Sequence, residues 1–312
     1  MNQSFTSSTR GFLLGSALFL SILAPVFAFG GSDKIYVNDD GKGKEEGTYD
    51  HPYHTISKAL KKAKEGSTVY VTKGRYKENI TLPKGVRLIG EKDREKVVIK
   101  ADNENQPTVT MKHDSELINI TVDGGRHGVR IQENAKAKVY KSVIRDSSRD
   151  GIHIDSGSRD KKRMVTIEDT IIKNNRMAGI FSEKRNIVVK NNNIMNNGDG
   201  IDFTAGIKAW FEGNRIHDNQ GSGAKFVLDG SSLWSKKNTF RDNKREGVEV
   251  NAYGESGNIG LKKAQIINNG RYGIARVART PQGGKTFGGM VLDQVQVEKN
   301  HLGQTSPVLR AW

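Results

Sequence analysis

One recurring position in this chain carries side chains that can transfer protons, hold charge and stack on flat rings. It lies two residues after a glycine that recurs at a period in the low twenties. In chain order, the residues at this position are Arg130, His153, Phe181, Asp202, Lys225, Glu249 and Ala275. This first row therefore combines cations, carboxylates, an imidazole and an aromatic ring, which are suited to acid–base chemistry and to stacking.

Asp202 and Glu249 are candidates for a pair of catalytic carboxylates. If they lie two turns of a β solenoid apart, their backbones are about 10 Å apart, near the upper end of the separation in inverting glycoside hydrolases. In a second interpretation, His153 or Lys225 abstracts a proton beside a uronate carboxylate that Arg130 neutralises. That is the chemistry of a lyase or an epimerase.

Phe181 would stack on a sugar ring in either interpretation. The same row also fits a purely structural role, in which Lys225 offsets Asp202 and Glu249 on neighbouring repeats and each pair adds a few tenths of a kcal/mol. The sequence leaves both roles open.

The elements that would position this row are short strands in a repeated unit. Pairs of Asn or Asp residues mark the period, and each unit has three apolar segments of period 2 separated by Asn or Gly corners. The pairs begin at Asn174, Asn196, Asp218, Asp242 and Asn268, with degenerate members at Asp146 and Lys299. A unit this small cannot bury its apolar side alone, so stacked coils with a continuous core are expected. Helical repeats tolerate Gly and Asn at every corner poorly.

The Asn pairs themselves are expected to be scaffold. Asn tolerates the left-handed backbone of a corner, and stacked Asn side chains can bond to one another along a solenoid.

Counting from the pairs gives two more rows. The second row, one residue before each pair, is largely basic and includes Arg145, Lys173 and Arg241. The third row, eight residues before, places Trp210 and Trp234 outward on consecutive coils, where they would stack on sugars or be covered by a loop or subunit.

These repeats resemble the right-handed parallel β-helix, or pectin-lyase-like, superfamily over essentially all of the chain after residue 28. The predicted fold class is all-β: a single-stranded right-handed parallel β-helix, a three-sheet solenoid with an N-terminal capping helix. Thr55 is a plausible N-cap for that helix, and Ile56, Ala59 and Leu60 form one apolar face. The resemblance implies that the first row lies on the sheet that holds the cleft in polysaccharide-active members. The superfamily contains lyases, hydrolases, epimerases, adhesins and non-catalytic scaffolds, so it does not decide function.

One segment resembles a sharper motif. Asn197-Gly198-Asp199-Gly200-Ile201-Asp202 is similar to the Asn-Thr-Asp-Gly-Ile-Asp segment of polygalacturonase-type hydrolases, which implies a catalytic role for Asp199. The paired aspartates expected on the following coil are replaced by Gly221 to Lys225. The later Gly-His-Gly and Arg-Ile-Lys segments are also missing, so the repeat itself explains the similarity better.

The N-terminus has the form of a secretory signal. Residues 1–28 carry one charge, Arg10, then the apolar run from Phe12 to Leu23 and a small-residue end at Ala28. The apolar run is shorter than the ~20 residues that span a bilayer, so no anchor is expected after cleavage. We predict one β-helix domain over 29–312, with N-terminal coils and capping helix in 29–100 and repeated coils in 101–312. The predicted location is secreted: periplasmic, cell-surface or extracellular.

The charge balance favours an anionic partner. The chain of 312 residues has 50 Lys and Arg against 35 Asp and Glu, a net charge of +15. For an exported protein this favours an acidic polysaccharide or envelope glycan, whereas nucleic acid is not expected because no nucleic-acid motif is present. The oligomeric state is not readable from the sequence.

The sequence predicts no definite metal site. There is no Cys, and the seven His lack zinc-ligand spacing; no other His is expected beside His153 or His217. The loop from Asn38 to Asp50 has enough oxygen ligands to hold Ca²⁺. We therefore expect a β-helix that binds, and in the enzymatic interpretation cleaves or epimerises, an acidic polysaccharide. One alternative is a non-catalytic envelope scaffold or adhesin. Another is a copper-delivery accessory protein with this fold, although its ligand set is not evident in the sequence.

Overall fold

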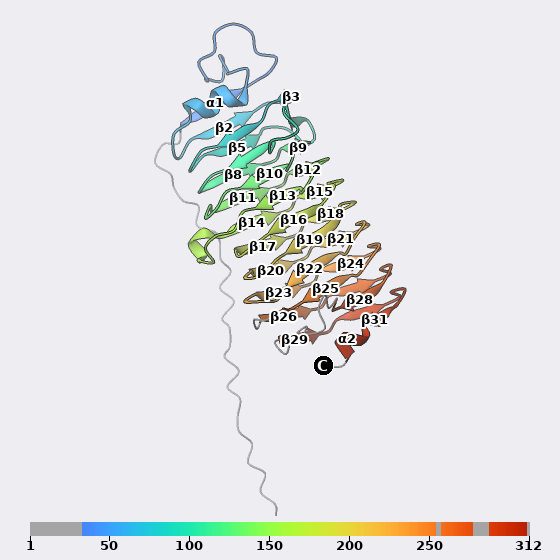
Figure 1. The fold of residues 1–312 in the computed structure, drawn as a ribbon. Helices are drawn as coiled ribbons and strands as arrows, with labels where there is room; N and C mark the ends of the chain where they lie inside the picture. The colour runs from blue at the N-terminus through green and yellow to red at the C-terminus, as the bar shows by residue number, and fades with distance from the viewer. Residues whose placement is uncertain (1–32, 254–256, 277–286, 311–312) are drawn as a thin grey trace, which may run out of the picture. The chain divides into compact units, whose positions relative to one another are not determined.

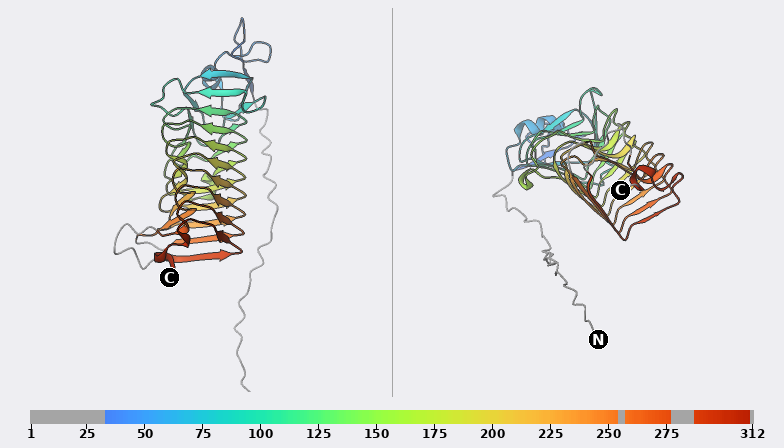
Figure 2. Two further views of the ribbon diagram at one scale, coloured as in Figure 1. Left: turned by 90° about the vertical axis from the view of Figure 1, so that its right-hand side faces the viewer. Right: turned by 60° about the horizontal axis from the view of Figure 1, so that its bottom comes forward.

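The structure is a computed structural model that describes residues 33–253, 257–276 and 287–310. The predicted signal peptide, residues 1–28, lies outside the described residues. Figures 1 and 2 show strands of successive coils stacked in layers.

Three parallel sheets, named A, B and C, form the walls of the solenoid, and each coil after the first strand of sheet A contributes one strand to each sheet. Sheet A contains β1 (Lys34–Val37), β2 (Thr68–Val71), β5 (Arg87–Gly90), β8 (Ser115–Ile118), β11 (Ala137–Tyr140), β14 (Val165–Glu168), β17 (Asn186–Lys190), β20 (Lys208–Glu212), β23 (Ser232–Lys236), β26 (Gly257–Lys262) and β29 (Phe287–Asp293). Sheet B contains β3 (Gly74–Lys77), β6 (Val97–Lys100), β9 (Thr121–Asp123), β12 (Val143–Arg145), β15 (Ile171–Lys173), β18 (Asn193–Met195), β21 (Arg215–His217), β24 (Thr239–Arg241), β27 (Gln265–Ile267) and β30 (Gln296–Glu298). Sheet C contains β4 (Ile80–Leu82), β7 (Val109–Met111), β10 (Val129–Ile131), β13 (Ile152–Ile154), β16 (Ala178–Ser182), β19 (Asp199–Phe203), β22 (Ala224–Val227), β25 (Val248–Asn251), β28 (Tyr272–Ala275) and β31 (Gly303–Thr305). The fold is the predicted parallel β-helix of three sheets.

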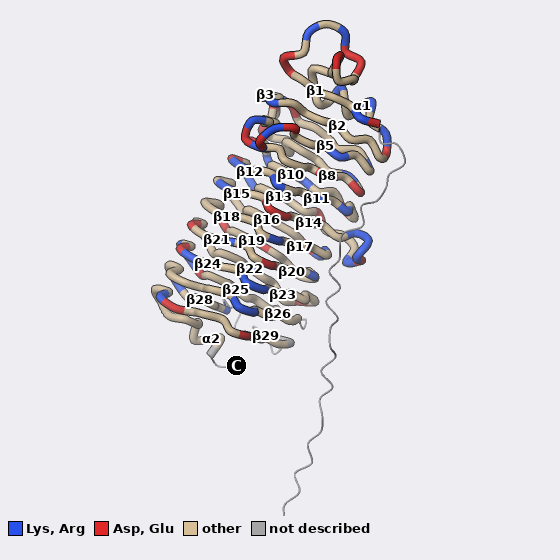
Figure 3. The backbone as a smooth tube through the Cα atoms, turned by 180° about the vertical axis from the view of Figure 1, so that it is seen from behind, with Lys and Arg blue, Asp and Glu red and all other residues tan. Residues whose placement is uncertain are grey.

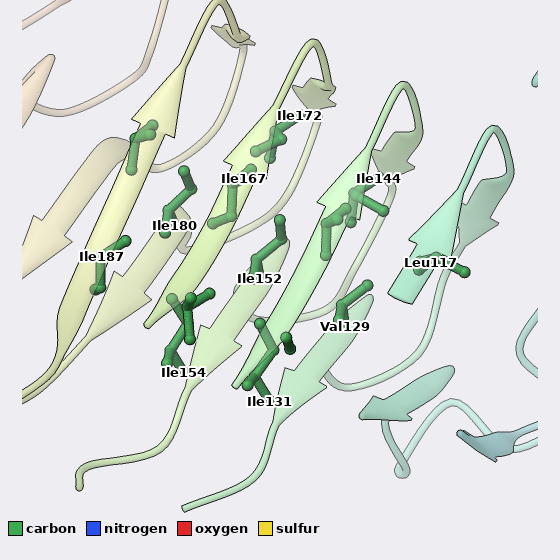
Figure 4. Close-up of a cluster of buried hydrophobic side chains, with 14 of the residues drawn as sticks. Leu117, Val129, Ile131, Ile144, Ile152, Ile154, Ile167, Ile172, Ile180 and Ile187 are labelled. Atoms are coloured by element: carbon green, nitrogen blue, oxygen red, sulfur yellow. The ribbon is translucent and has the colours of Figure 1, made fainter. Parts of the chain in front are cut away.

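The core is a set of columns of apolar side chains. Ile172 pairs in register with Ile194, which pairs with Ile216, and all three are buried. Figure 4 shows the neighbouring columns, with Ile152 and Ile180 on successive strands of sheet C and both pointing inward. Period-2 alternation sends one set of side chains into this core and leaves the other on the outer faces.

The Asn pairs form corners and a ladder, as predicted. The first residue of each pair adopts a positive φ between 54° and 59°, a conformation that Asn and Asp tolerate. The second residues form a buried ladder in which each Asn side-chain amide donates to the next, at 2.8–3.2 Å, through Asn175, Asn197, Asn219, Asn243, Asn269 and Asn300. The ladder fixes the register of every coil it crosses.

The predicted capping helix is present as α1 (Ile56–Lys62). Thr55 is its N-cap and accepts a hydrogen bond from the Lys58 backbone N–H, while Glu78 accepts two more from the first turn. Ile56, Ala59 and Leu60 are buried, so the helix covers apolar surface at the end of the solenoid near β1, β2 and β4. Two other short helical segments are η1 (Lys161–Arg163) and α2 (Pro307–Arg310).

Within the described ranges, no helix is both long enough and apolar enough to cross a membrane.

Candidate functional site

The first row is a true column on the outer face of sheet C. Strand register pairs each member with the next, through Arg130, His153, Phe181, Asp202, Lys225, Glu249 and Ala275. The predicted alignment of this row is therefore confirmed.

A fourth row, which the sequence analysis missed, runs beside it. Its residues directly precede the corner glycines, and they are His127, Asp150, Ala178, Asp199, Ser222, Glu246 and Tyr272. The corner glycines bond across coils to this row: the N–H of Gly200, for example, donates to the carbonyl of Ser222. A Cβ at Gly200 would lie 2.3 Å from the carbonyl oxygen of Gly223, so close stacking of the coils requires glycine there. The same period that identified the first row could have identified this one.

The two rows meet in a histidine cluster, which we define as His127, Asp150 and His153. Nδ1 of His153 lies 2.9 Å from Oδ2 of Asp150, and Nδ1 of His127 lies 3.2 Å from the same oxygen. The two imidazole rings are 4.4 Å apart, and Phe181 stacks on His153 at 4.9 Å. The sequence predicted no other histidine beside His153. That expectation was wrong, because neighbouring coils bring residues 26 positions apart in sequence into contact.

The electrostatics of this cluster follow from burial and close partners. Burial opposes the charge of Asp150, but the interactions with His127 and His153 outweigh it and lower the Asp150 pKa to about 2. Burial also lowers the pKa of His127, against the opposing effect of Asp150. Asp155 completes the surroundings: it accepts bonds from the Arg130 guanidinium at 3.0 and 3.1 Å and lies 3.6 Å from Nε2 of His153.

A second group, the aspartate–lysine cluster, contains Asp199, Asp202 and Lys225. Lys225 Nζ donates to Asp199 at 2.6 Å, and the backbone N–H of Ser222 donates to the other carboxylate oxygen at 2.7 Å. Burial raises the Asp202 pKa to about 6, Lys225 acts in the opposite direction, and the neighbouring carboxylate of Asp199 adds to the increase. The structural interpretation of the first row predicted that Lys225 pairs with Asp202 and Glu249. The residue that Lys225 actually hydrogen-bonds is Asp199, which belongs to the fourth row.

Glu249 lies in the first row but is only 2% exposed. Its two carboxylate oxygens lie within hydrogen-bonding distance of the Ser222 hydroxyl, at 3.1 Å, and the Asn251 amide, at 3.0 Å. The neighbouring Glu246 is also buried and lies 3.0 Å from Nε of Arg271. Glu249 therefore faces a polar network inside the protein, not open solvent.

The second row is also in register, on the outer face of sheet B. Arg145 pairs with Lys173, and Arg241 follows two strands beyond Met195. Arg145 bonds to Asp123 at 3.0 Å and Arg241 to Asp242 at 2.7 Å. Figure 3 shows basic and acidic residues spread over many coils.

The two tryptophans of the third row lie side by side on the outer face of sheet A. Trp210 pairs with Trp234, and they are 40% and 50% exposed. The Trp234 indole lies over Gly260, where an added Cβ would be 2.6 Å from a ring carbon. The groove around them is also lined by Val291 and Lys262. The outward direction of both rings is confirmed, and their role in binding stays a prediction.

The acidic residues of the N-terminal loop have separate partners. Glu45 accepts from the His54 backbone N–H and from Lys58, Glu46 pairs with Lys44, and Asp39 accepts from the Arg75 backbone N–H. Ca²⁺ binding by this loop stays a prediction. In the part of the chain that the structure describes, the one group of three His, Asp or Glu side chains placed closely enough to hold a metal ion is the histidine cluster.

Comparisons with known proteins address the fold. A search of curated proteins by sequence finds no match. Among solved structures, a pectate lyase aligns over 88% of this chain and 79% of its own, with 13% identity and a TM-score of 0.53. A mannuronan C-5 epimerase module from Azotobacter vinelandii aligns over 81% and 94%, with 16% identity and a TM-score of 0.46. A pectin methylesterase from Aspergillus niger aligns over 89% and 91%, with 13% identity and a TM-score of 0.48.

At these identities the likeness to the pectate lyase concerns the fold alone. The family model for the right handed beta helix region matches residues 108–282, more than half of the chain and all of sheet C from β7 to β28. The chain therefore belongs to the right-handed β-helix family.

Proposed function

We propose that this protein binds an acidic polysaccharide along the outer face of sheet C and cleaves it with Asp202 as the general acid. The observation that carries the proposal is the environment of Asp202, a largely buried carboxyl between Phe181 and Lys225 on adjacent strands, with its pKa raised to about 6. A carboxyl with such a pKa is still partly protonated near neutral pH and can donate that proton to a leaving oxygen.

The neighbours of Asp202 suit a sugar chain that crosses the coils. Phe181 offers a ring for stacking, and Lys225 and Arg130 supply positive charge in the same row. Asp199, held by Lys225 and the Ser222 N–H, provides a second carboxylate on the same strand. The polymer is proposed to be acidic because the chain carries a net charge of +15.

We also propose that the protein works outside the cytoplasm. The support is the sequence of residues 1–28, with Arg10 before a short apolar run and a small-residue end. Residues 29–312 would then form the mature domain.

A non-catalytic envelope scaffold or adhesin is the second candidate, and the pairing of charges on sheet C favours it. Three ion pairs neutralise their own charges: Lys225 with Asp199, Arg130 with Asp155, and Arg271 with Glu246. Such pairs stabilise a column without any ligand.

Turnover of polyuronates separates the two candidates. The purified protein is incubated with polygalacturonate and with alginate, and both new reducing ends and near-ultraviolet absorbance are followed. Hydrolysis gives reducing ends without absorbance, whereas elimination gives an unsaturated product that absorbs. We expect reducing ends only, with a rate that falls as pH rises above about 6 because Asp202 then loses its proton.

The matched variants are Asp202→Asn and Asp102→Asn, which make the same chemical change at the site and at an exposed carboxylate paired with Lys77. Asp202→Asn should lower the rate at least 100-fold and leave binding intact, and Asp102→Asn should have no effect. Binding without product in the unsubstituted protein would favour the scaffold. A product that absorbs in the near ultraviolet would show that the protein cleaves by elimination and not by general-acid hydrolysis.

A further inference from the structure

The histidine cluster lies where two rows of the solenoid converge. His127, which precedes Gly128, and His153, which follows Gly151, come from adjacent coils, and both imidazoles approach one oxygen of Asp150. His127 is 7% exposed, and His153 is partly covered by the ring of Phe181. The fold thus holds two imidazoles and a carboxylate together at a place that the proposed proton transfer does not use.

We propose that His127, Asp150 and His153 bind one divalent transition-metal ion of the zinc type. All three ligand atoms lie within 4.8 Å of one another. In a tetrahedral site with bonds near 2.1 Å, ligand atoms are about 3.4 Å apart. The observed separations of 2.9 and 3.2 Å from Asp150 Oδ2 to the two Nδ1 atoms are only slightly shorter.

One of these ligand atoms has no hydrogen bond. Nδ1 of His127 is buried and, although it lies 3.2 Å from Asp150, it makes no hydrogen bond of acceptable geometry. A buried polar atom without a partner is costly. A metal ion at the centre of the cluster would satisfy it together with Nδ1 of His153.

The surroundings also match those of a metal site. A histidine that binds metal through one ring nitrogen usually directs the other toward a carboxylate. Nε2 of His153 lies 3.6 Å from Oδ1 of Asp155, which Arg130 fixes in place, and the other oxygen of Asp150 accepts the backbone N–H of Ala178 at 3.2 Å. Three protein ligands leave a fourth position for water or a ligand oxygen.

The ligand set selects the type of ion. Imidazole nitrogens suit Zn²⁺, Co²⁺ and similar ions, whereas Ca²⁺ and Mg²⁺ prefer oxygen ligands alone. This site is therefore different in position and in chemistry from the loop between Asn38 and Asp50, which offers oxygen ligands for Ca²⁺.

Cobalt binding tests the proposal without any assay of turnover. The purified protein is stripped with a chelator, dialysed and titrated with Co²⁺, and the visible absorbance is recorded. We expect one Co²⁺ per chain, with the intense band of four-coordinate cobalt, and loss of that band when Zn²⁺ is added. Absence of binding by the unsubstituted protein at micromolar metal would overturn the proposal.

Variants then identify the ligands. His153→Ala and His127→Ala should each weaken binding more than 100-fold, and Asp155→Asn should weaken it 10- to 100-fold. The matched control is His217→Ala on sheet B, a histidine that bonds to Asn193 and Asp218 and belongs to no group of three possible metal ligands among the described residues. It should bind as the unsubstituted protein does. If His127→Ala does not fold, as judged by circular dichroism, His153→Ala decides the question, because its side chain is partly exposed. Unchanged affinity in His153→Ala, or equal loss in His217→Ala, would refute the assignment.

Discussion

Replacing Asp202 by Asn should raise the free energy of unfolding, relative to the unsubstituted protein, by more at high pH than at low pH. The carboxyl is largely buried, and its pKa rises from 3.8 to about 6 in the folded protein. Because the folded pKa lies above the unfolded value, the protonated form favours folding. This contribution is fully present below about pH 4 and is lost as pH rises through about 6.

The magnitude follows from the size of the increase. Each pKa unit corresponds to 1.36 kcal/mol, so an increase of about 2 units makes the ionised side chain cost about 3 kcal/mol at pH 8 relative to pH 4. Asn does not ionise. The free energy of unfolding of Asp202→Asn, minus that of the unsubstituted protein, should therefore rise by about 3 kcal/mol between these two pH values.

Urea denaturation at pH 4, 6 and 8 measures this difference, provided that the slope with urea concentration is the same for both proteins. Most of the change should fall between pH 4 and pH 6.5. Asp102→Asn, at an exposed carboxylate, should show a difference within about 0.5 kcal/mol at every pH. A difference for Asp202→Asn that is the same at pH 4 and pH 8 would refute the reasoning, and the general-acid proposal would lose its main support.

Three other predictions concern the scaffold and the third row. Arg185 is fully buried, and its guanidinium donates to four backbone carbonyls, including those of Gln132 and Asp155 at 3.3 and 3.1 Å. Arg185→Ala should therefore lower the free energy of unfolding by at least about 3 kcal/mol. A loss under about 1 kcal/mol in urea denaturation would contradict this. Asn219→Ala interrupts the Asn ladder, in which Oδ1 of Asn219 accepts hydrogen bonds from Asn197. It should lower the free energy of unfolding by at least about 2 kcal/mol in the same measurement. An unchanged denaturation midpoint would show that the ladder is not needed there. Replacing Trp210 and Trp234 together by Ala should weaken glycan binding about tenfold or more with little change in unfolding, if sugars stack on these exposed rings; retained affinity on a glycan array would exclude that platform.

Much of the fold could be predicted because like positions repeat. The columns through Ile172 and Ile194, the positive φ at Asn174 and the helix after Thr55 all depend on local residue types and on one period. A residue's place in the repeat fixes which neighbour it stacks on, since parallel strands in register leave no other choice. For this reason the first row could be written down from the sequence with its order correct.

The contacts between rows are harder to predict. The period assigns His127 to a corner and His153 to a strand, but it does not give the direction of a side chain at a corner, where the backbone leaves the regular alternation of a strand. The meeting of the two imidazoles at Asp150 depends on those directions and on the glycines between the rows. The same limit explains Lys225, which is opposite Asp202 in the strand register and yet bonds to Asp199 at 2.6 Å.

Glu249 shows why outward direction does not establish access. Its place in the alternation is outward, and the register agrees, because it pairs with Lys225. Yet it is buried, because Ser222 from the adjacent coil and Asn251 from its own strand both approach its carboxylate. A buried carboxylate with both oxygens engaged by neighbours is poorly placed to bind a water for attack on a sugar, since that water would have to displace Ser222 or Asn251. Glu249→Gln should therefore affect stability more than turnover, with turnover falling less than tenfold in the reducing-end assay. A 100-fold loss in a variant with unchanged urea denaturation would instead restore Glu249 as a partner of Asp202.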